Sequence, residues 1–129
     1  LKERIDKCQI AGITPHIAVI IVGDDPASHV YVGAKIRACE RLGIKSTHIE
    51  MSESSKETEL IDVIDELNND DSVHGILIQS PLPSHMNEES LTDLINPLKD
   101  VDGFHPVNLG RLVQSRDDCL IPCTPNGVM

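Results

Sequence analysis

The 129-residue chain has almost no aromatic side chains: it has no tryptophan, a single tyrosine (Tyr31) and a single phenylalanine (Phe104). Its core must therefore be built from Ile, Leu, Val and Ala. Basic residues are also few, because 11 Lys and Arg stand against 21 Asp and Glu, which gives a formal net charge of −10. This acidic balance argues against nucleic acid or an anionic membrane surface as a partner.

Several motifs that would identify a common class of site are also missing. The four cysteines form no CxxC pair, and the six histidines show no metal-ligand spacing, so no metal site is expected. Cysteines without a pairing pattern favour a reducing compartment, the cytoplasm or an organelle matrix. We expect neither a signal peptide nor a membrane-spanning segment. No GxGxxG or GxxxxGKS/T fingerprint occurs, so these residues carry no recognisable phosphate cradle for a nucleotide.

Apolar runs alternate with helical patterns along most of the chain. The uninterrupted, largely β-branched run 17–22 predicts a parallel strand that is covered on both faces. A helix is predicted over 26–42, with Asp25 as its N-cap, Pro26 in its first position and Gly43 just past its end.

Two more strands and two more helices are expected. In order along the chain they are a strand at 45–50, a helix opened by a capping box at 54–57, a strand at 75–79 and a short helix capped by Asn87. The charged, turn-rich stretch 97–106 is predicted to be a loop outside the core, and 119–122 is a candidate strand.

This alternation predicts an α/β fold, a three-layer domain with a mostly parallel sheet, like the N-terminal domain of amino-acid dehydrogenases. The expected strand order is 2-1-3, which places a ligand-binding crevice at the carboxyl ends of the first and third strands. The helix after strand one brings Tyr31 and Lys35 to this crevice, and strand three ends in Gln79.

Each of these side chains also has a purely structural interpretation. Tyr31 and Lys35 lie one turn apart in a row next to the apolar row of helix 26–42, so we expect both on a core-facing stripe. A lysine there most often covers apolar surface at the rim. Gln79 can simply meet water at a strand end, and Asp100 or Asp102 can make an Asx turn. Because Tyr31, Lys35 and Gln79 are expected at the same crevice, the functional interpretation is favoured for these three residues.

Four segments together resemble one family: VGDDPASHVYVGAK (22–35), GILIQSPLP (75–83), KDVDGFHPVNLGRL (99–112) and PCTPNGV (122–128). It is the bifunctional methylenetetrahydrofolate dehydrogenase/methenyltetrahydrofolate cyclohydrolase family, and the resemblance covers almost the whole chain in order and spacing. It implies that residues 1–129 are the folate-binding catalytic domain and that an NADP-binding Rossmann domain begins just beyond residue 129. One departure is Ser80, which stands where the family often has Leu.

The resemblance also implies roles for individual residues. Lys35 would be the catalytic lysine, Gln79 would hold it in position, and Tyr31 would stack on or hydrogen-bond the folate. Asp102 would recognise the pterin ring. Pro81 and Leu82 would contact the substrate as well.

The implied enzyme oxidises 5,10-methylene-tetrahydrofolate to 5,10-methenyl-tetrahydrofolate with NADP, and hydrolyses the product to 10-formyl-tetrahydrofolate. It would act in one-carbon metabolism and purine biosynthesis, in the cytoplasm, as a homodimer when full-length, with folate substrates as its ligands. Two alternatives remain open at this point. One is the substrate domain of another NAD(P)-dependent dehydrogenase, which would need a carboxylate-binding Arg or Lys pair at the crevice. The other is a non-catalytic small-molecule-binding module.

Overall fold

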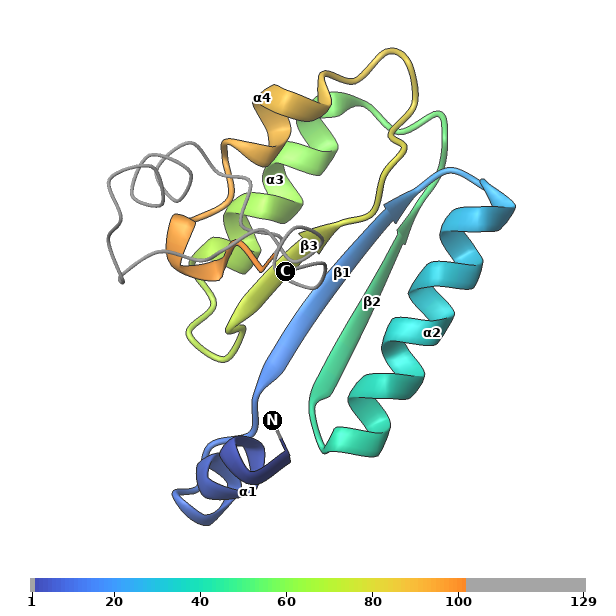
Figure 1. Cartoon of the computed structure of the whole chain (residues 1–129). Coiled ribbons are helices and arrows are strands. Elements are labelled where there is room, and N and C mark those ends of the chain that lie inside the picture. Colours follow the sequence, from blue (N-terminus) through green and yellow to red (C-terminus); the bar gives the residue numbers. More distant parts are fainter. Residues whose placement is uncertain (1, 102–129) are drawn as a thin grey trace, which may run out of the picture.

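The computed structural model describes residues 2–101, which alternate between helices and strands as expected (Figure 1). The elements are α1 (Lys2–Ile10), β1 (His16–Val22), α2 (Pro26–Leu42), β2 (Lys45–Met51), α3 (Glu57–Asn68), β3 (Gly75–Ile78), α4 (Glu88–Thr92) and the 3-10 helix η1 (Pro97–Lys99). The candidate strand at 119–122 lies outside the described residues. No described helix has the length and apolar character that a membrane crossing requires.

The three strands form one parallel sheet in the order β2-β1-β3, which confirms the predicted order. Helix α2 covers one face of this sheet, and α3 and α4 lie on the other face (Figure 1). The described part therefore has the three layers of an α/β domain.

The central strand β1 supplies side chains to a core on each face of the sheet. Ala18 and Ile20 pack with Leu60 of α3, whereas Val19 and Ile21 pack with α2. All four β1 side chains are at most 2% exposed. The uninterrupted apolar run is thus explained by burial on both sides.

Helix α2 begins and ends where its sequence predicted. The Asp25 side chain accepts a hydrogen bond from the Ser28 N–H at 3.1 Å, and Pro26 follows as the first helical residue. Gly43 ends the helix in the left-handed conformation, with φ of 80°, which a residue with a Cβ adopts only at a cost.

Two local predictions were wrong. The capping box is not at 54–57: α3 begins two residues later, with Lys56 at the N-cap position and its N–H donating to Glu59 Oε2 at 3.4 Å. The stretch 97–106 is also not wholly outside the core, because Asp100 is only 1% exposed and pairs in parallel with Ile76 of β3. Asp100 and Val101, which follow η1, thus lie beside β3, a contact that the sequence composition did not indicate.

Candidate active site

Helix α2 presents Tyr31 and Lys35 to solvent, so the prediction that both lie on a core-facing stripe was wrong. Tyr31 is 61% exposed and Lys35 is also exposed, while Val32 in the adjacent row is 1% exposed. Within residues 2–101 the helix buries a stripe narrower than two full rows: Val32 is buried, and Ile36 and Cys39 are half-buried. The second row lies at the edge of the contact and remains accessible to a ligand.

The ammonium of Lys35 nevertheless meets the amide of Gln79. Lys35 Nζ donates a hydrogen bond of 2.9 Å to Gln79 Oε1, which joins α2 to the residue that follows β3. Gln79 continues the β3 pairing, since its N–H donates to the Ile20 carbonyl at 2.8 Å. The predicted convergence at the carboxyl ends of β1 and β3 is therefore confirmed for these two side chains.

The Gln79 amide is held in one orientation from both sides. Its Nε2 donates to the backbone carbonyl of Ser80 at 3.2 Å, an atom that can only accept. The other side faces the ammonium of Lys35, which can only donate, so Oε1 must point there. The lysine uses one of its three N–H donors in this contact, and no described side chain or carbonyl accepts from the other two.

Ser28 is a site residue that sequence reasoning missed. It lies in the first turn of α2, is 2% exposed, and its hydroxyl donates to the same Ser80 carbonyl at 3.0 Å. This bond ties the start of α2 to the end of β3, directly beside Gln79. A short polar residue three positions after an N-cap is commonplace, so the sequence carried no signal for this tertiary contact.

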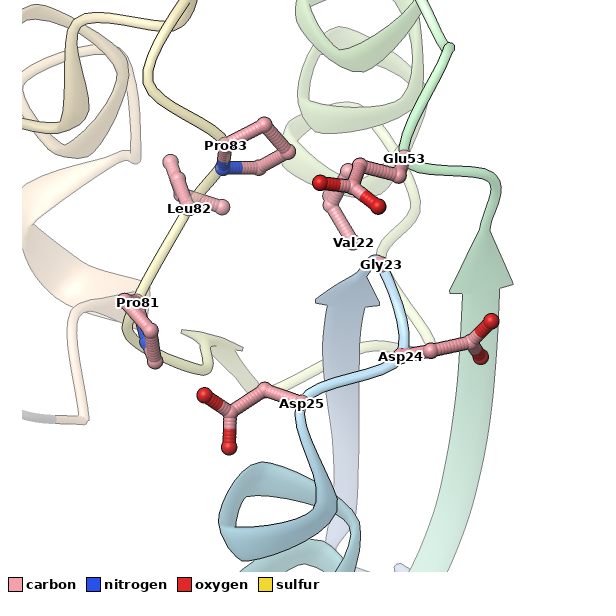
Figure 2. A pocket seen from close by; sticks show the side chains of 8 residues that line it. All are labelled: Val22, Gly23, Asp24, Asp25, Glu53, Pro81, Leu82 and Pro83. Atoms are coloured by element: carbon pink, nitrogen blue, oxygen red, sulfur yellow. The ribbon is translucent and has the colours of Figure 1, made fainter.

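Pro81 and Leu82 line a neighbouring hollow of about 350 Å³. Its opposite wall is the turn after β1, with Asp25, and Glu53 completes the rim (Figure 2). The Asp25 carboxylate points toward Pro81 across the hollow. Lys35 is not among the lining residues, so the structure places the predicted contact residues beside the Lys35–Gln79 pair rather than around it.

Several hydrogen bonds fix the loop that carries Pro81 and Leu82. The Ser80 hydroxyl donates to Glu88 at the start of α4. His85 Nε2 donates to the Ser55 carbonyl at 2.8 Å, and the Asn87 N–H donates to a Glu57 carboxylate oxygen at 2.9 Å. The loop is thus attached to both helices on its face of the sheet, although Ser80 itself departs from the residue that the resemblance led us to expect.

The remaining predicted site residue, Asp102, lies just outside the described residues. The basic pair that a carboxylate-binding dehydrogenase domain would need is not found at the crevice in the described chain. Arg37 and Arg41 instead line a separate hollow on α2 with Ala34 and Glu40.

Comparison with known proteins identifies the family. Residues 1–102 match the family described as tetrahydrofolate dehydrogenase/cyclohydrolase, catalytic domain. The whole chain is 50% identical to the bifunctional protein FolD of Oceanobacillus iheyensis and 53% identical to that of Ruminiclostridium cellulolyticum. It spans only 45% of the length of each relative.

Solved structures agree with this assignment. The bifunctional FolD methylenetetrahydrofolate dehydrogenase/cyclohydrolase of Campylobacter jejuni superposes with a TM-score of 0.97 at 48% identity, over 99% of this chain and 45% of that one. The Trypanosoma brucei FolD, solved with NADP cofactor and an inhibitor, gives 0.91 at 30% identity, over 99% of this chain and 44% of that one. This chain belongs to the tetrahydrofolate dehydrogenase/cyclohydrolase family.

Proposed function

We propose that the full-length protein oxidises 5,10-methylene-tetrahydrofolate to 5,10-methenyl-tetrahydrofolate, with NADP as the hydride acceptor, and hydrolyses the methenyl product to 10-formyl-tetrahydrofolate. Membership of the family and the names of its relatives support both activities. The observation that carries the proposal is the 2.9 Å hydrogen bond between Lys35 Nζ and Gln79 Oε1 at the ligand-binding edge of the sheet.

Lys35 is the proposed proton carrier in the hydrolytic step. Water adds to the methenyl carbon, one C–N bond of the ring breaks, and the departing nitrogen needs a proton. The ammonium that Gln79 anchors keeps two N–H donors for the ligand, so it can deliver that proton and receive one again from water. The neutral amide holds the lysine without adding a negative charge beside it.

Tyr31, Asp102, Pro81 and Leu82 are the proposed substrate-binding residues. The exposed ring of Tyr31, one turn before Lys35, offers a flat face to a planar ligand. The carboxylate of Asp102 accepts hydrogen bonds only, which suits the amide and amino donors at the edge of a pterin. Pro81 and Leu82 supply apolar surface two and three residues after Gln79.

We propose that NADP binds mainly to a Rossmann domain beyond residue 129, and that residues 1–129 form the folate-binding catalytic domain. Among residues 2–101 the positive-φ glycines are Gly12, Gly23 and Gly43, and none of these belongs to a glycine-rich phosphate loop. The chain spans only 45% of the length of the Oceanobacillus iheyensis relative, which is consistent with such a domain in the full-length protein.

Replacing the lysine tests the proposal. In the full-length protein, Lys35→Met should lower the rate of 5,10-methenyl-tetrahydrofolate hydrolysis on the order of 10²- to 10⁴-fold, because methionine keeps the side-chain length but carries no proton. The matched control is Lys45→Met, an exposed lysine on β2, which should leave the rate unchanged. Cyclohydrolase turnover retained by Lys35→Met would remove Lys35 from the mechanism.

The 129-residue chain itself should bind folate weakly at most and should show no NADP-dependent oxidation. The reason is that the proposed cofactor domain would form one wall of the active-site cleft. Measured formation of NADPH by the 129-residue chain alone would contradict the proposal that NADP binds mainly to a second domain.

We further propose that the full-length protein is a cytoplasmic homodimer, with an organelle matrix as the alternative compartment, and that its product serves purine biosynthesis. The free thiols of Cys8 and Cys39 support a reducing compartment. Burial raises the pKa of the Cys39 thiol, which keeps it protonated and inert. Sedimentation of the full-length protein at the mass of a monomer would contradict the dimer.

A further inference from the structure

The loop between β3 and α4, residues 80–87, forms one wall of the hollow of about 350 Å³. Pro81, Leu82 and Pro83 of this loop lie across the hollow from the turn after β1 (Figure 2). Leu82 also packs against the buried core, whereas Pro81 is exposed. Apolar packing therefore fixes only part of this wall, and polar contacts fix its two ends.

Ser80, at the start of the loop, is held by helices that lie on opposite faces of the sheet. Its carbonyl accepts from the Ser28 hydroxyl of α2 at 3.0 Å and from Gln79 Nε2 at 3.2 Å. Its hydroxyl donates to the carboxylate of Glu88, in the first turn of α4. Leucine, which the family resemblance led us to expect at position 80, has no hydroxyl, so the contact with α4 depends on this departure.

The far end of the loop is fixed by the start of α3. The Asn87 N–H donates to Oε2 of Glu57, the first residue of α3, at 2.9 Å. His85 Nε2 donates to the Ser55 carbonyl at 2.8 Å. A backbone N–H can only donate, so an apolar side chain in place of Glu57 would leave it without this acceptor. One carboxylate thus holds each end of the loop, Glu88 at its start and Glu57 at its end.

We propose that Glu57 and Glu88 are positioning residues for the folate substrate and that they act through the loop 80–87. The inference rests on the proposed function, in which this loop contacts the substrate. A wall that is held in place before the ligand arrives loses less freedom on binding, so removing either carboxylate should weaken substrate affinity. The contacts that orient Gln79 use other groups, so the chemical step should change little.

The test measures KM and kcat for hydrolysis of 5,10-methenyl-tetrahydrofolate by the full-length protein. Glu57→Met and Glu88→Met should each raise KM about three- to tenfold, the range expected for one lost hydrogen bond, with kcat within about twofold of the parent. Glu57→Gln keeps an oxygen that can accept from the Asn87 N–H, so its KM should stay near that of the parent. Glu89→Met, at the exposed neighbour of Glu88, is the matched control and should leave both constants unchanged.

A double variant shows whether Glu88 acts through Ser80. Ser80→Ala removes the other half of the contact, so combining it with Glu88→Met should raise KM no further than either change alone. Rises that multiply would overturn the inference, and so would an unchanged KM in Glu57→Met and Glu88→Met while the parent hydrolyses its substrate. A lower kcat without a higher KM would overturn it as well, because the carboxylates would then support the chemical step.

The parent protein separates this inference from the proposed function. No hydrolysis by the parent would contradict the proposed function, and the inference with it. Glu88→Met provides the readout if Glu57→Met does not fold, because Glu88 is exposed whereas Glu57 is half-buried.

Discussion

At the scale of single residues, the site depends on one backbone carbonyl. The Ser80 carbonyl accepts from both Gln79 Nε2 and the Ser28 hydroxyl, so it links the start of α2 to the amide that holds Lys35. Lys35 is exposed and has only the Gln79 oxygen as a partner among the described residues. The orientation of this flexible side chain therefore depends on how firmly its neighbours are held.

Ser28→Ala should weaken both the fold and the site. It removes the buried hydroxyl donor and leaves the Ser80 carbonyl with one bond, which should cost about 1 kcal/mol of unfolding free energy. Urea denaturation of the full-length protein measures this, and the cyclohydrolase rate should fall several-fold in the same variant. Ser84→Ala, in an exposed loop position, is the control and should change neither. An unchanged stability in Ser28→Ala would mean that the Ser28 hydroxyl does not stabilise the contact between α2 and the end of β3.

Asp70 should make stability depend on pH in the acid range. Its carboxylate accepts from the Ser72 hydroxyl at 2.6 Å and from the Ser72 N–H at 2.9 Å, and these bonds lower the pKa of the Asp70 carboxyl below its usual 3.8. Because the folded pKa is the lower one, the stabilisation is complete above the unfolded value and is lost as pH falls through the folded value.

Asp70→Asn should therefore reduce stability at neutral pH and flatten its decline between about pH 5 and pH 2. Urea unfolding across that range is the measurement. Asp71→Asn is the control, since the Asp71 carboxylate makes no hydrogen bond or ion pair within residues 2–101. An equally steep decline in Asp70→Asn would show that the Ser72 bonds do not persist in solution.

At the scale of elements, α2 is the helix on which the site is built, and its N-cap decides where it begins. Asp25→Ala should destabilise the full-length protein by about 1 kcal/mol, because the Ser28 N–H loses its acceptor. Asp24→Ala, one residue earlier in the same turn, is the matched control: that carboxylate is fully exposed, 3.8 Å from His29. In thermal unfolding, the melting temperature should fall in Asp25→Ala but not in Asp24→Ala. Equal melting temperatures would contradict the capping role of Asp25.

Elements with strong local signals could be predicted from the sequence. Strand β1 and helix α2 were predicted correctly, because the signals that define them are local. An apolar run marks the strand, and the N-cap, the proline and the glycine mark the two ends of the helix. The start of α3 was misplaced by two residues, because serine and glutamate at 54–57 satisfy a capping pattern that the backbone does not use. The burial of Asp100 was missed because its neighbours are distant in sequence: Asp100 pairs with Ile76 of β3, and the preceding Lys99 donates to the Leu67 carbonyl at the end of α3.

The same distinction holds for the site. Periodicity and strand order were enough to bring Lys35 to Gln79, since both follow from which strand lies beside which. The exposure of Lys35 and Tyr31 was not predictable, because it depends on how wide a stripe α2 can bury against three strands. Ser28 could not be found either, because its partner is a backbone carbonyl 52 residues away.

At the scale of the whole molecule, the strand order brings Lys35 of α2 to Gln79, the residue that follows β3. The order β2-β1-β3 puts β1 beside β3, so the helix that follows one strand meets the residue that ends the other. Switching the strand order would separate Lys35 from Gln79 without changing either residue. The contact between Lys35 and Gln79 is therefore a property of the topology as much as of the side chains.

The most direct test is the coupling between Lys35 and Gln79 in the cyclohydrolase rate of the full-length protein. Gln79→Met removes the amide at similar size, Lys35→Met removes the ammonium, and the double variant removes both. If the two side chains act as one unit, both single variants lose hydrolysis and the double variant is no slower than Lys35→Met. A normal rate in Gln79→Met, or losses that multiply in the double variant, would contradict a catalytic pair.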